Sequence, residues 1–227
     1  MIVEIPSLLS AEDLAKVRAL LARSPWGDGR MTAGTQSSQV KRNQQVPESA
    51  PELAPARAIV HAALERNALF FSAALPARIV PPLFNRYGEG MGFGAHIDNA
   101  MRSIPGSADR VRTDLSVTLF LSDPDSYDGG ELVIEDVFGE KHVKLAAGSM
   151  ILYPGTSLHR VEPITRGERL ASFFWIQSMI RDQDARRTLF DMDVAIASLR
   201  GKHGDTNELV SLTGVYHNLL RRWASTG

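Results

Sequence analysis

The sequence predicts an α+β fold in which helices flank a central block of short strands. Apolar residues recur at helical spacing near both ends of the chain, and between them short apolar stretches alternate with turn residues. Such a block of strands is typical of a barrel or a sandwich. With 227 residues, 44% of them hydrophobic, the chain is long enough to bury one sizeable core.

The composition excludes several classes of protein. The chain has 25 Lys and Arg against 26 Asp and Glu, so we expect no nucleic-acid binding and no membrane-surface binding. Cysteine is absent, which excludes disulfides, iron–sulfur clusters and thiol catalysis. Any metal must therefore be bound by His and carboxylates. We recognise no signal peptide and no apolar stretch of membrane-spanning length, and expect a cytoplasmic protein.

Two helices are predicted before the strands. A helix from Ser10 to Arg23 is indicated by aliphatic residues at helical spacing, with Ser10 as a suitable N-cap. A second helix is predicted from about Pro51 to Phe71, because proline is favoured in the first turn. Between them the chain is polar, and we expect at most a short strand around 39–44.

Seven strands are predicted in the central block. They are 78–87, 94–98, 114–121, 131–135, 141–144, 149–153 and 169–177. By composition, we expect loops at 99–110, 122–130 and 154–156. Because side chains alternate along a strand, the segment 114–121 places four aliphatic residues on one face and Ser116, Thr118 and Phe120 on the other.

The helical period returns after the last predicted strand. Two apolar stripes follow, formed by Leu189, Met192, Ile196 and Leu199 and then by Leu209, Leu212, Tyr216, Leu219 and Trp223. Asp205 and Glu208 have the spacing of a capping box for the second helix. We therefore expect a helical hairpin over 181–227, appended to a domain over 1–180 whose core is roughly 78–178. The hairpin is a candidate surface for a homodimer.

The residues that carry chemistry gather around the segment 94–98. His96 and Asp98 point to the same face of the predicted strand, so both can bind one metal. His159 is the best candidate for a third ligand, because it begins the extended segment after the buried strand 149–153. Two His and one carboxylate leave open positions, which suits non-haem Fe(II), whereas a structural zinc site is closed by four ligands.

Arg169 is the next residue of interest. It lies ten residues after His159, and a turn at 166–167 would return it to the metal pocket. On its strand Arg169 shares one face with apolar residues, including Trp175, which we expect in the pocket wall or in the core. An arginine among apolar side chains needs an anionic partner, and its fork matches a carboxylate. A dicarboxylate that reaches from Arg169 to the metal would fit.

In this order, His96-x-Asp98, His159 and Arg169 resemble the Fe(II)/2-oxoglutarate-dependent dioxygenases. The resemblance is greatest to the prolyl-4-hydroxylase-like branch, and within it to the bacterial PKHD-type (PiuC-like) hydroxylases. The segments that support it are 85–88, 95–100, 128–132 and 158–161. The wider oxygenase resemblance covers roughly 78–178, and the resemblance to the bacterial group covers nearly the whole chain.

The resemblance implies a double-stranded β-helix, or jelly roll, with N-terminal flanking helices and a C-terminal helical hairpin. By the same resemblance His96, Asp98 and His159 would bind Fe(II). Arg169 would bind the distal carboxylate of the co-substrate 2-oxoglutarate.

Further pocket residues are implied by the same family. Tyr87 stands where related hydroxylases carry a pocket tyrosine, so we expect it to line the co-substrate site. Some prolyl hydroxylases have a tyrosine near the position of Phe120 that helps to bind the distal carboxylate. Phe120 has no hydroxyl, so Thr118 or another donor would have to replace it, or Arg169 would act with water.

The implied activity is that of a hydroxylase. It would couple the decarboxylation of 2-oxoglutarate, to succinate and CO₂, with hydroxylation of a substrate by O₂, and ascorbate would keep the iron reduced. The substrate stays open between a siderophore-related small molecule and a peptidyl proline or lysine. Two other classes also stay open, a cupin-like zinc or manganese hydrolase and a sensor of iron or 2-oxoglutarate. Succinate production separates the first class from both.

Charges and glycines near the motif have simpler interpretations. Arg102, Arg110 and Arg112 flank the loop after the metal motif, and we interpret them as solvated charges. The alternative is a lid that covers the pocket or contacts an anionic substrate. We interpret Gly129 and Gly130 as a turn and a site of close packing.

Overall fold

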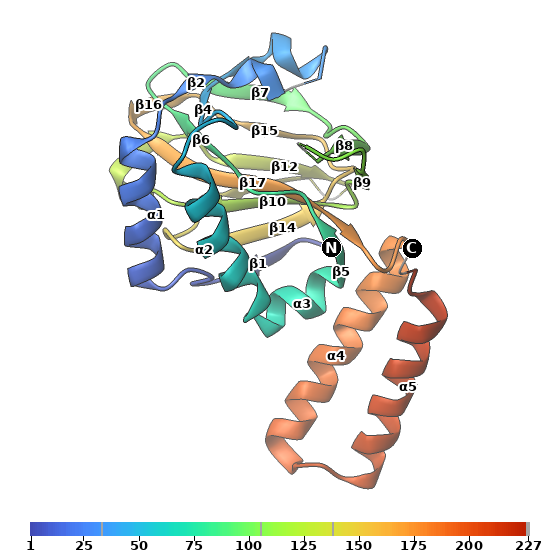
Figure 1. The fold of residues 1–227 in the computed structure, drawn as a ribbon. Helices are drawn as coiled ribbons and strands as arrows, with labels where there is room; N and C mark the ends of the chain where they lie inside the picture. Colours follow the sequence, from blue (N-terminus) through green and yellow to red (C-terminus); the bar gives the residue numbers. More distant parts are fainter. Residues whose placement is uncertain (33, 105, 138, 226–227) are drawn as a thin grey trace.

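The computed structural model describes residues 1–32, 34–104, 106–137 and 139–225. Two antiparallel sheets form a jelly roll, which confirms the predicted fold class (Figure 1). The larger sheet has the order β1 (Val3–Ile5), β14 (Met150–Pro154), β10 (Leu115–Phe120), β17 (Arg169–Ser178), β6 (Leu83–Tyr87), β4 (Gln44–Gln45) and β2 (Gly27–Asp28), and β5 (Pro76–Ile79) also pairs with β17. The smaller sheet has the order β13 (Gly139–Val143), β12 (Leu132–Asp136), β15 (His159–Val161), β7 (Gly92–His96) and β3 (Lys41–Arg42).

Apolar side chains fill the space between the sheets. Phe120 and Tyr153 of the larger sheet pack there with Leu132, Ile134 and Val161 of the smaller one. The aliphatic residues of β10 point the other way, into a second cluster beneath the helices. The alternation predicted for 114–121 is therefore confirmed, and it leaves Ser116 and Thr118 on the inner face of the larger sheet.

Three helices cover the outer face of the larger sheet (Figure 1). The first, α1 (Ala11–Arg23), begins as predicted, because the Ser10 side chain accepts a hydrogen bond from the amide of Asp13. The single helix predicted over 51–71 is wrong. The chain forms α2 (Leu53–Glu65) and α3 (Ala68–Ala74), because the Asn67 side chain accepts a hydrogen bond from the amide of Phe70 and caps a new helix.

Several strand predictions need correction. The strand predicted over 78–87 is divided into β5 and β6, because Pro81 and Pro82 cannot donate to the ladder. The segment 39–44 forms two short strands, and β1 and β2 escape prediction because they have only three and two residues. Two pairs lie in segments expected to be loops or turns. They are β8 (Met101–Ser103) with β9 (Arg110–Arg112), and β11 (Tyr127–Gly129) with β16 (Ile164–Gly167).

The C-terminal hairpin is formed by α4 (Gln183–His203) and α5 (Asn207–Trp223), which project away from the sheets (Figure 1). Most residues of the two predicted apolar stripes pack against one another in a single cluster. This cluster also contains Leu75 and Ile180, which lie before the hairpin in the chain. Leu199 and Leu212 are the exceptions, because they are 39% and 40% exposed. The N-cap of α5 is Thr206 rather than the predicted Asp205.

None of the helices in the described ranges is long and apolar enough to cross a membrane. The division of the chain at residue 180, a homodimer formed through the hairpin and a cytoplasmic location stay predictions.

Candidate metal centre

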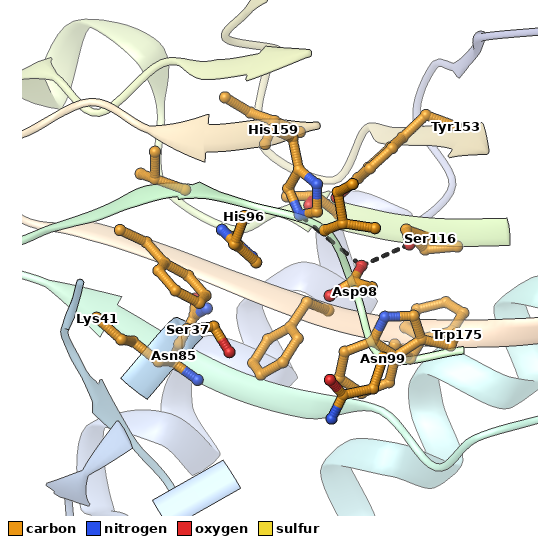
Figure 2. Close-up of a pocket in the computed structure, with 18 of the residues that line it drawn as sticks. Ser37, Lys41, Asn85, His96, Asp98, Asn99, Ser116, Tyr153, His159 and Trp175 are labelled. Atoms are coloured by element: carbon orange, nitrogen blue, oxygen red, sulfur yellow. Dashed lines mark hydrogen bonds and ion pairs between the residues drawn. The ribbon is translucent and has the colours of Figure 1, made fainter. Parts of the chain in front are cut away.

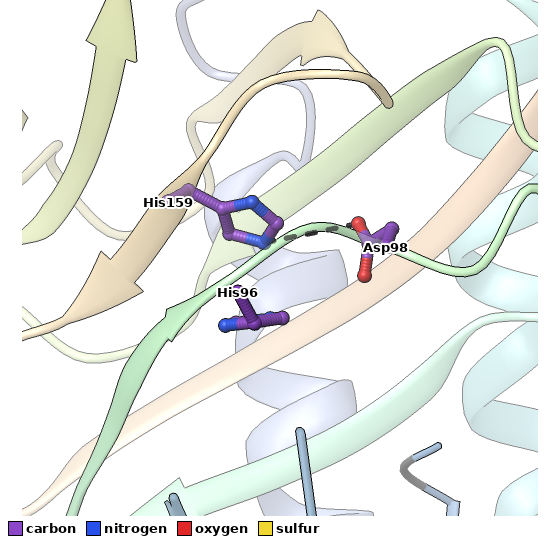
Figure 3. A group of neighbouring side chains, drawn as sticks. All are labelled: His96, Asp98 and His159. Carbon is purple, nitrogen blue, oxygen red and sulfur yellow. Dashed lines mark ion pairs between the residues drawn. The ribbon is translucent and has the colours of Figure 1, made fainter. Parts of the chain in front are cut away.

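Neighbouring strands bring His96 and His159 together. The two residues face each other across the antiparallel pair of β7 and β15. Asp98 lies two residues beyond the end of β7, so the strand predicted over 94–98 begins and ends two residues earlier than expected. Its Oδ2 atom lies 3.7 Å from Nε2 of His159. The potential ligand atoms of the three side chains all lie within 4.8 Å of one another (Figure 3).

Hydrogen bonds fix the orientation of both imidazole rings. Nδ1 of His96 lies 2.8 Å from the carbonyl oxygen of Gly94, and Nδ1 of His159 lies 3.0 Å from that of Ser157. A carbonyl oxygen can only accept, so in each ring Nδ1 carries the proton and donates it. Nε2 is then left with a free lone pair, the state that binds a metal.

The electrostatics of the site favour the same protonation states. Burial and the neighbouring His159 lower the pKa of His96 to about 4. Burial raises the pKa of Asp98, but His159 and hydrogen bonds from Ser116 and Trp175 hold it below its ordinary value. At neutral pH His96 is therefore neutral and Asp98 is ionised. Two imidazole nitrogens and one carboxylate that line a pocket fit Fe(II) with open positions.

Ser116 positions the carboxylate, because its Oγ donates to Oδ2 of Asp98 at 2.6 Å (Figure 2). Partners of metal-binding side chains typically contribute 10- to 100-fold to affinity. We therefore expect Ser116→Ala to weaken Co(II) binding by roughly 10-fold or more, measured by calorimetry under anaerobic conditions. Ser211→Ala, on the exposed side of α5, is the control. Equal affinities in the two variants would contradict this role of Ser116.

Arg169 begins β17 and points into the same pocket. It is 1% exposed, and its guanidinium carbon lies 5.4 Å from the ring centre of Tyr87 and 5.2 Å from that of Phe120. Within the described residues its Nε and Nη2 atoms make no hydrogen bond. Leaving a guanidinium buried without a partner is costly, so Arg169 requires an anion, and its fork fits a carboxylate.

The other predicted pocket residues have distinct positions. Tyr87, Thr118 and Trp175 line the pocket, and Trp175 also packs in a small buried cluster with Val80 and Val111. Phe120 packs in the core against Arg169. Tyr127, which the sequence did not indicate, has a buried hydroxyl beside Arg169.

Gly130 allows the chain to pass close to Arg169. Its φ is +68°, and a Cβ there would lie 2.3 Å from Cδ1 of Ile164 and 3.1 Å from Cδ of Arg169. The interpretation as a site of close packing is confirmed. We expect Gly130→Ala to destabilise the protein by about 1–3 kcal/mol and to displace Arg169.

Urea unfolding and 2-oxoglutarate titrations measure these two effects. Gly201→Ala in α4 is the control, because nothing lies within 4 Å of a Cβ at Gly201. A Gly130→Ala variant as stable as this control, with unchanged 2-oxoglutarate binding, would contradict the prediction.

Two further cations line the pocket, and of these the sequence indicated only Arg102, as one of the charges that flank the loop after the metal motif. Lys41 on β3 is only 4% exposed. Arg102 on β8 lies 3.9 Å above the Trp175 ring, so its interpretation as a solvated charge is wrong. Lys41, Asn43 and Gln45 are buried at every second position of their segment. The segment 30–50 is polar throughout, so its sequence does not show which side chains point inward.

The buried Lys41 makes stability depend on pH. Burial and the nearby Arg102 lower the pKa of Lys41 to about 7, whereas an unfolded lysine titrates near 10.4. Between these values only the unfolded chain holds the proton, so this group makes the free energy of unfolding rise with pH by about 1.4 kcal/mol per unit. Lys41→Met lacks this contribution. We expect the variant to be the more stable protein at pH 7, and the difference to shrink towards pH 10.

Urea unfolding of both proteins at pH 7, 8 and 9 measures the difference. A difference that does not change with pH would contradict the depressed pKa of Lys41.

Two family descriptions match the chain. The 2OG-Fe(II) oxygenase superfamily matches residues 82–177, and the PKHD-type hydroxylase C-terminal domain matches residues 183–225. A PKHD-type hydroxylase of Nitrosomonas europaea is 58% identical to this chain over 227 residues, and the alignment covers 100% of both chains. A PKHD-type hydroxylase of Saccharophagus degradans is 56% identical over 226 residues, again with 100% of both chains covered.

Solved structures share the fold at low identity. A prolyl-4-hydroxylase of Pseudomonas putida has a TM-score of 0.51 and 21% identity, covering 78% of this chain and 92% of that chain. A Trichoplax adhaerens prolyl hydroxylase bound to a peptide has a TM-score of 0.55 and 13% identity, covering 83% and 86%. HygX of Streptomyces hygroscopicus has a TM-score of 0.55 and 14% identity, covering 78% and 82%. The chain belongs to the PKHD-type hydroxylases, and is a 2-oxoglutarate-dependent dioxygenase of the 2OG-Fe(II) oxygenase superfamily.

Proposed function

We propose that this enzyme is a hydroxylase in which His96, Asp98 and His159 bind Fe(II) and Arg169 binds the distal carboxylate of 2-oxoglutarate. The observation that carries this assignment is the buried Arg169, unpaired among the described residues, in the same pocket as the three potential ligands. Bound iron would supply the oxidising chemistry that couples decarboxylation of 2-oxoglutarate with hydroxylation. A cupin-like hydrolase has no need of Arg169, so the pocket favours the oxygenase.

The chain itself orients the co-substrate. Arg169 would fix one end by a bidentate contact, and the Tyr87 and Phe120 rings on either side would hold the guanidinium in place. Two hydroxyls are candidates for the second donor that Phe120 lacks. Thr118 lines the pocket, and Tyr127 lies beside Arg169, with a hydroxyl pKa that burial raises. A raised pKa keeps the Tyr127 hydroxyl protonated, as a donor must be.

Succinate formation tests the proposal. Purified protein with Fe(II), 2-oxoglutarate, ascorbate and air is expected to release succinate, detected by proton NMR, and to release none when Fe(II) is omitted. Binding of 2-oxoglutarate without succinate would indicate a sensor. Failure to bind 2-oxoglutarate in iron-loaded protein would overturn the proposal and favour a zinc or manganese hydrolase.

The substrate proposal keeps two classes, a siderophore-related small molecule and a peptidyl proline or lysine. Candidates of each class, added to the succinate assay, are expected to accelerate 2-oxoglutarate consumption only when they are substrates. The same assay, run with and without ascorbate, tests whether ascorbate sustains turnover.

A further inference from the structure

Lys41 and Arg102 converge on one residue. Nζ of Lys41 donates to Oγ1 of Thr32 at 3.1 Å, and Nη1 of Arg102 donates to the Thr32 carbonyl oxygen at 2.9 Å. Within the described part of the chain, neither side chain forms an ion pair with a carboxylate, and Nε of Arg102 is buried without a hydrogen bond. The fold therefore holds two positive groups side by side with no carboxylate paired to either, although the charge of the nearby Asp98 acts on both.

Aromatic rings connect this cationic pair with the metal centre. The Lys41 ammonium lies 5.2 Å from the ring centre of Phe93 and 5.5 Å from that of Phe173. Phe93 in turn stacks on the His96 ring at 3.6 Å. Arg102 lies above Trp175, whose side chain hydrogen-bonds to Asp98. Both cations line the pocket of the three potential ligands, and Figure 2 shows Lys41 across this group from Tyr153.

The cationic pair is separate from Arg169. Arg169 and Trp175 are six residues apart on the inner face of β17, which corresponds to about 20 Å along a strand. The distal carboxylate of a co-substrate held by Arg169 therefore does not neutralise Lys41 and Arg102. The two cations repel each other, and this repulsion, together with burial, lowers the pKa of Lys41. Two buried like charges destabilise a fold, and this cost is relieved either when Lys41 loses its proton or when a ligand of opposite charge lies between the two groups.

We propose that Lys41 and Arg102 bind an anionic group of the substrate, a carboxylate or a similar oxyanion, and so place a neighbouring C–H bond at the metal centre. The inference rests on the proposed function, because the proposed function assigns the Arg169 end of the same pocket to the co-substrate. The rings of Phe173 and Trp175 then pack against the apolar part of the substrate next to its anionic group. A neutral substrate would leave both cations without an anionic partner, so we expect it to bind less tightly than an anionic one.

Benzoate and its neutral isostere benzamide test the charge requirement. They are titrated by calorimetry into anaerobic protein loaded with Fe(II) and saturating 2-oxoglutarate, so that Arg169 is occupied. We expect benzoate to bind at least tenfold more tightly than benzamide. We expect Lys41→Met and Arg102→Met each to remove this preference and to leave 2-oxoglutarate binding unchanged. Arg110→Met, an exposed residue of the same hairpin, is the matched control.

A second titration separates this inference from the proposed function. Metal-free Arg169→Met protein keeps only the Lys41–Arg102 pair, and it is expected to prefer benzoate in the same way. If iron and 2-oxoglutarate do not bind but this preference is present, the proposed function fails and the anion site stands. Equal binding of benzoate and benzamide, no binding of either at 50 mM, or an undiminished preference in Lys41→Met would overturn the inference.

Discussion

Replacement of Asp98 by alanine is expected to abolish turnover. Asp98 is the only carboxylate among the three potential ligands, and its negative charge balances the cation that the two neutral imidazoles would hold. Without it, Fe(II) binding weakens and its open positions lose their arrangement. We expect Asp98→Ala to reduce Fe(II)-dependent succinate formation by more than about 1,000-fold, or roughly 4 kcal/mol.

The measurement is proton NMR of succinate at saturating 2-oxoglutarate, with iron content determined in parallel. Asp125→Ala, an exposed carboxylate outside the pocket, is the control and is expected to behave as the unmodified protein. Unimpaired turnover of Asp98→Ala at full iron occupancy would show that Asp98 is not a ligand.

Replacement of Arg169 by methionine is expected to have the second largest effect, and to act on the co-substrate alone. The guanidinium is buried between two aromatic rings, and methionine has a similar length without the charge. Loss of a charge-assisted bidentate contact costs about 2–3 kcal/mol, so we expect the KM for 2-oxoglutarate to rise by about 100-fold. Fe(II) affinity is expected to stay unchanged. The metal-free variant is expected to be at least as stable, because a buried unpaired cation is removed.

Initial rates over a range of 2-oxoglutarate concentrations give the KM, and Co(II) calorimetry gives the metal affinity. Arg166→Met is the matched control, because Arg166 pairs with Asp128 at the surface. A KM that rises equally in both variants, or a parallel loss of metal affinity in Arg169→Met, would contradict the assigned role.

The residues of the candidate metal centre could be predicted from the sequence, because the pattern that marks them depends on short segments. His96 and Asp98 are two residues apart, and the order of His159 and Arg169 along the chain follows the strands that carry them. Alternation along β10 likewise predicted which side chains share the inner face of the sheet, and Ser116 is among them. Alternation along a strand depends only on neighbouring residues, so it can be predicted without knowledge of the tertiary contacts.

The remaining features depend on contacts that sequence patterns do not record. Arg102 bonds to Thr32, 70 residues away, and stacks on Trp175, so its burial depends on three segments meeting. The break between α2 and α3 depends on a single cap at Asn67, inside a run whose apolar content is continuous with both helices. A polar side chain in a polar segment, such as Lys41, gives no sign of facing inward until its neighbours are known.

Anaerobic visible spectroscopy tests the assigned metal and co-substrate sites most directly. Fe(II) is added to the metal-free protein, and then 2-oxoglutarate, while absorbance is followed for the weak metal-to-ligand charge-transfer band of the chelated complex. The band is expected in the unmodified protein, absent in Asp98→Ala and weakened in Arg169→Met. An iron-loaded, correctly folded protein that shows no band on addition of 2-oxoglutarate would contradict the assignment of this pocket as the oxygenase centre.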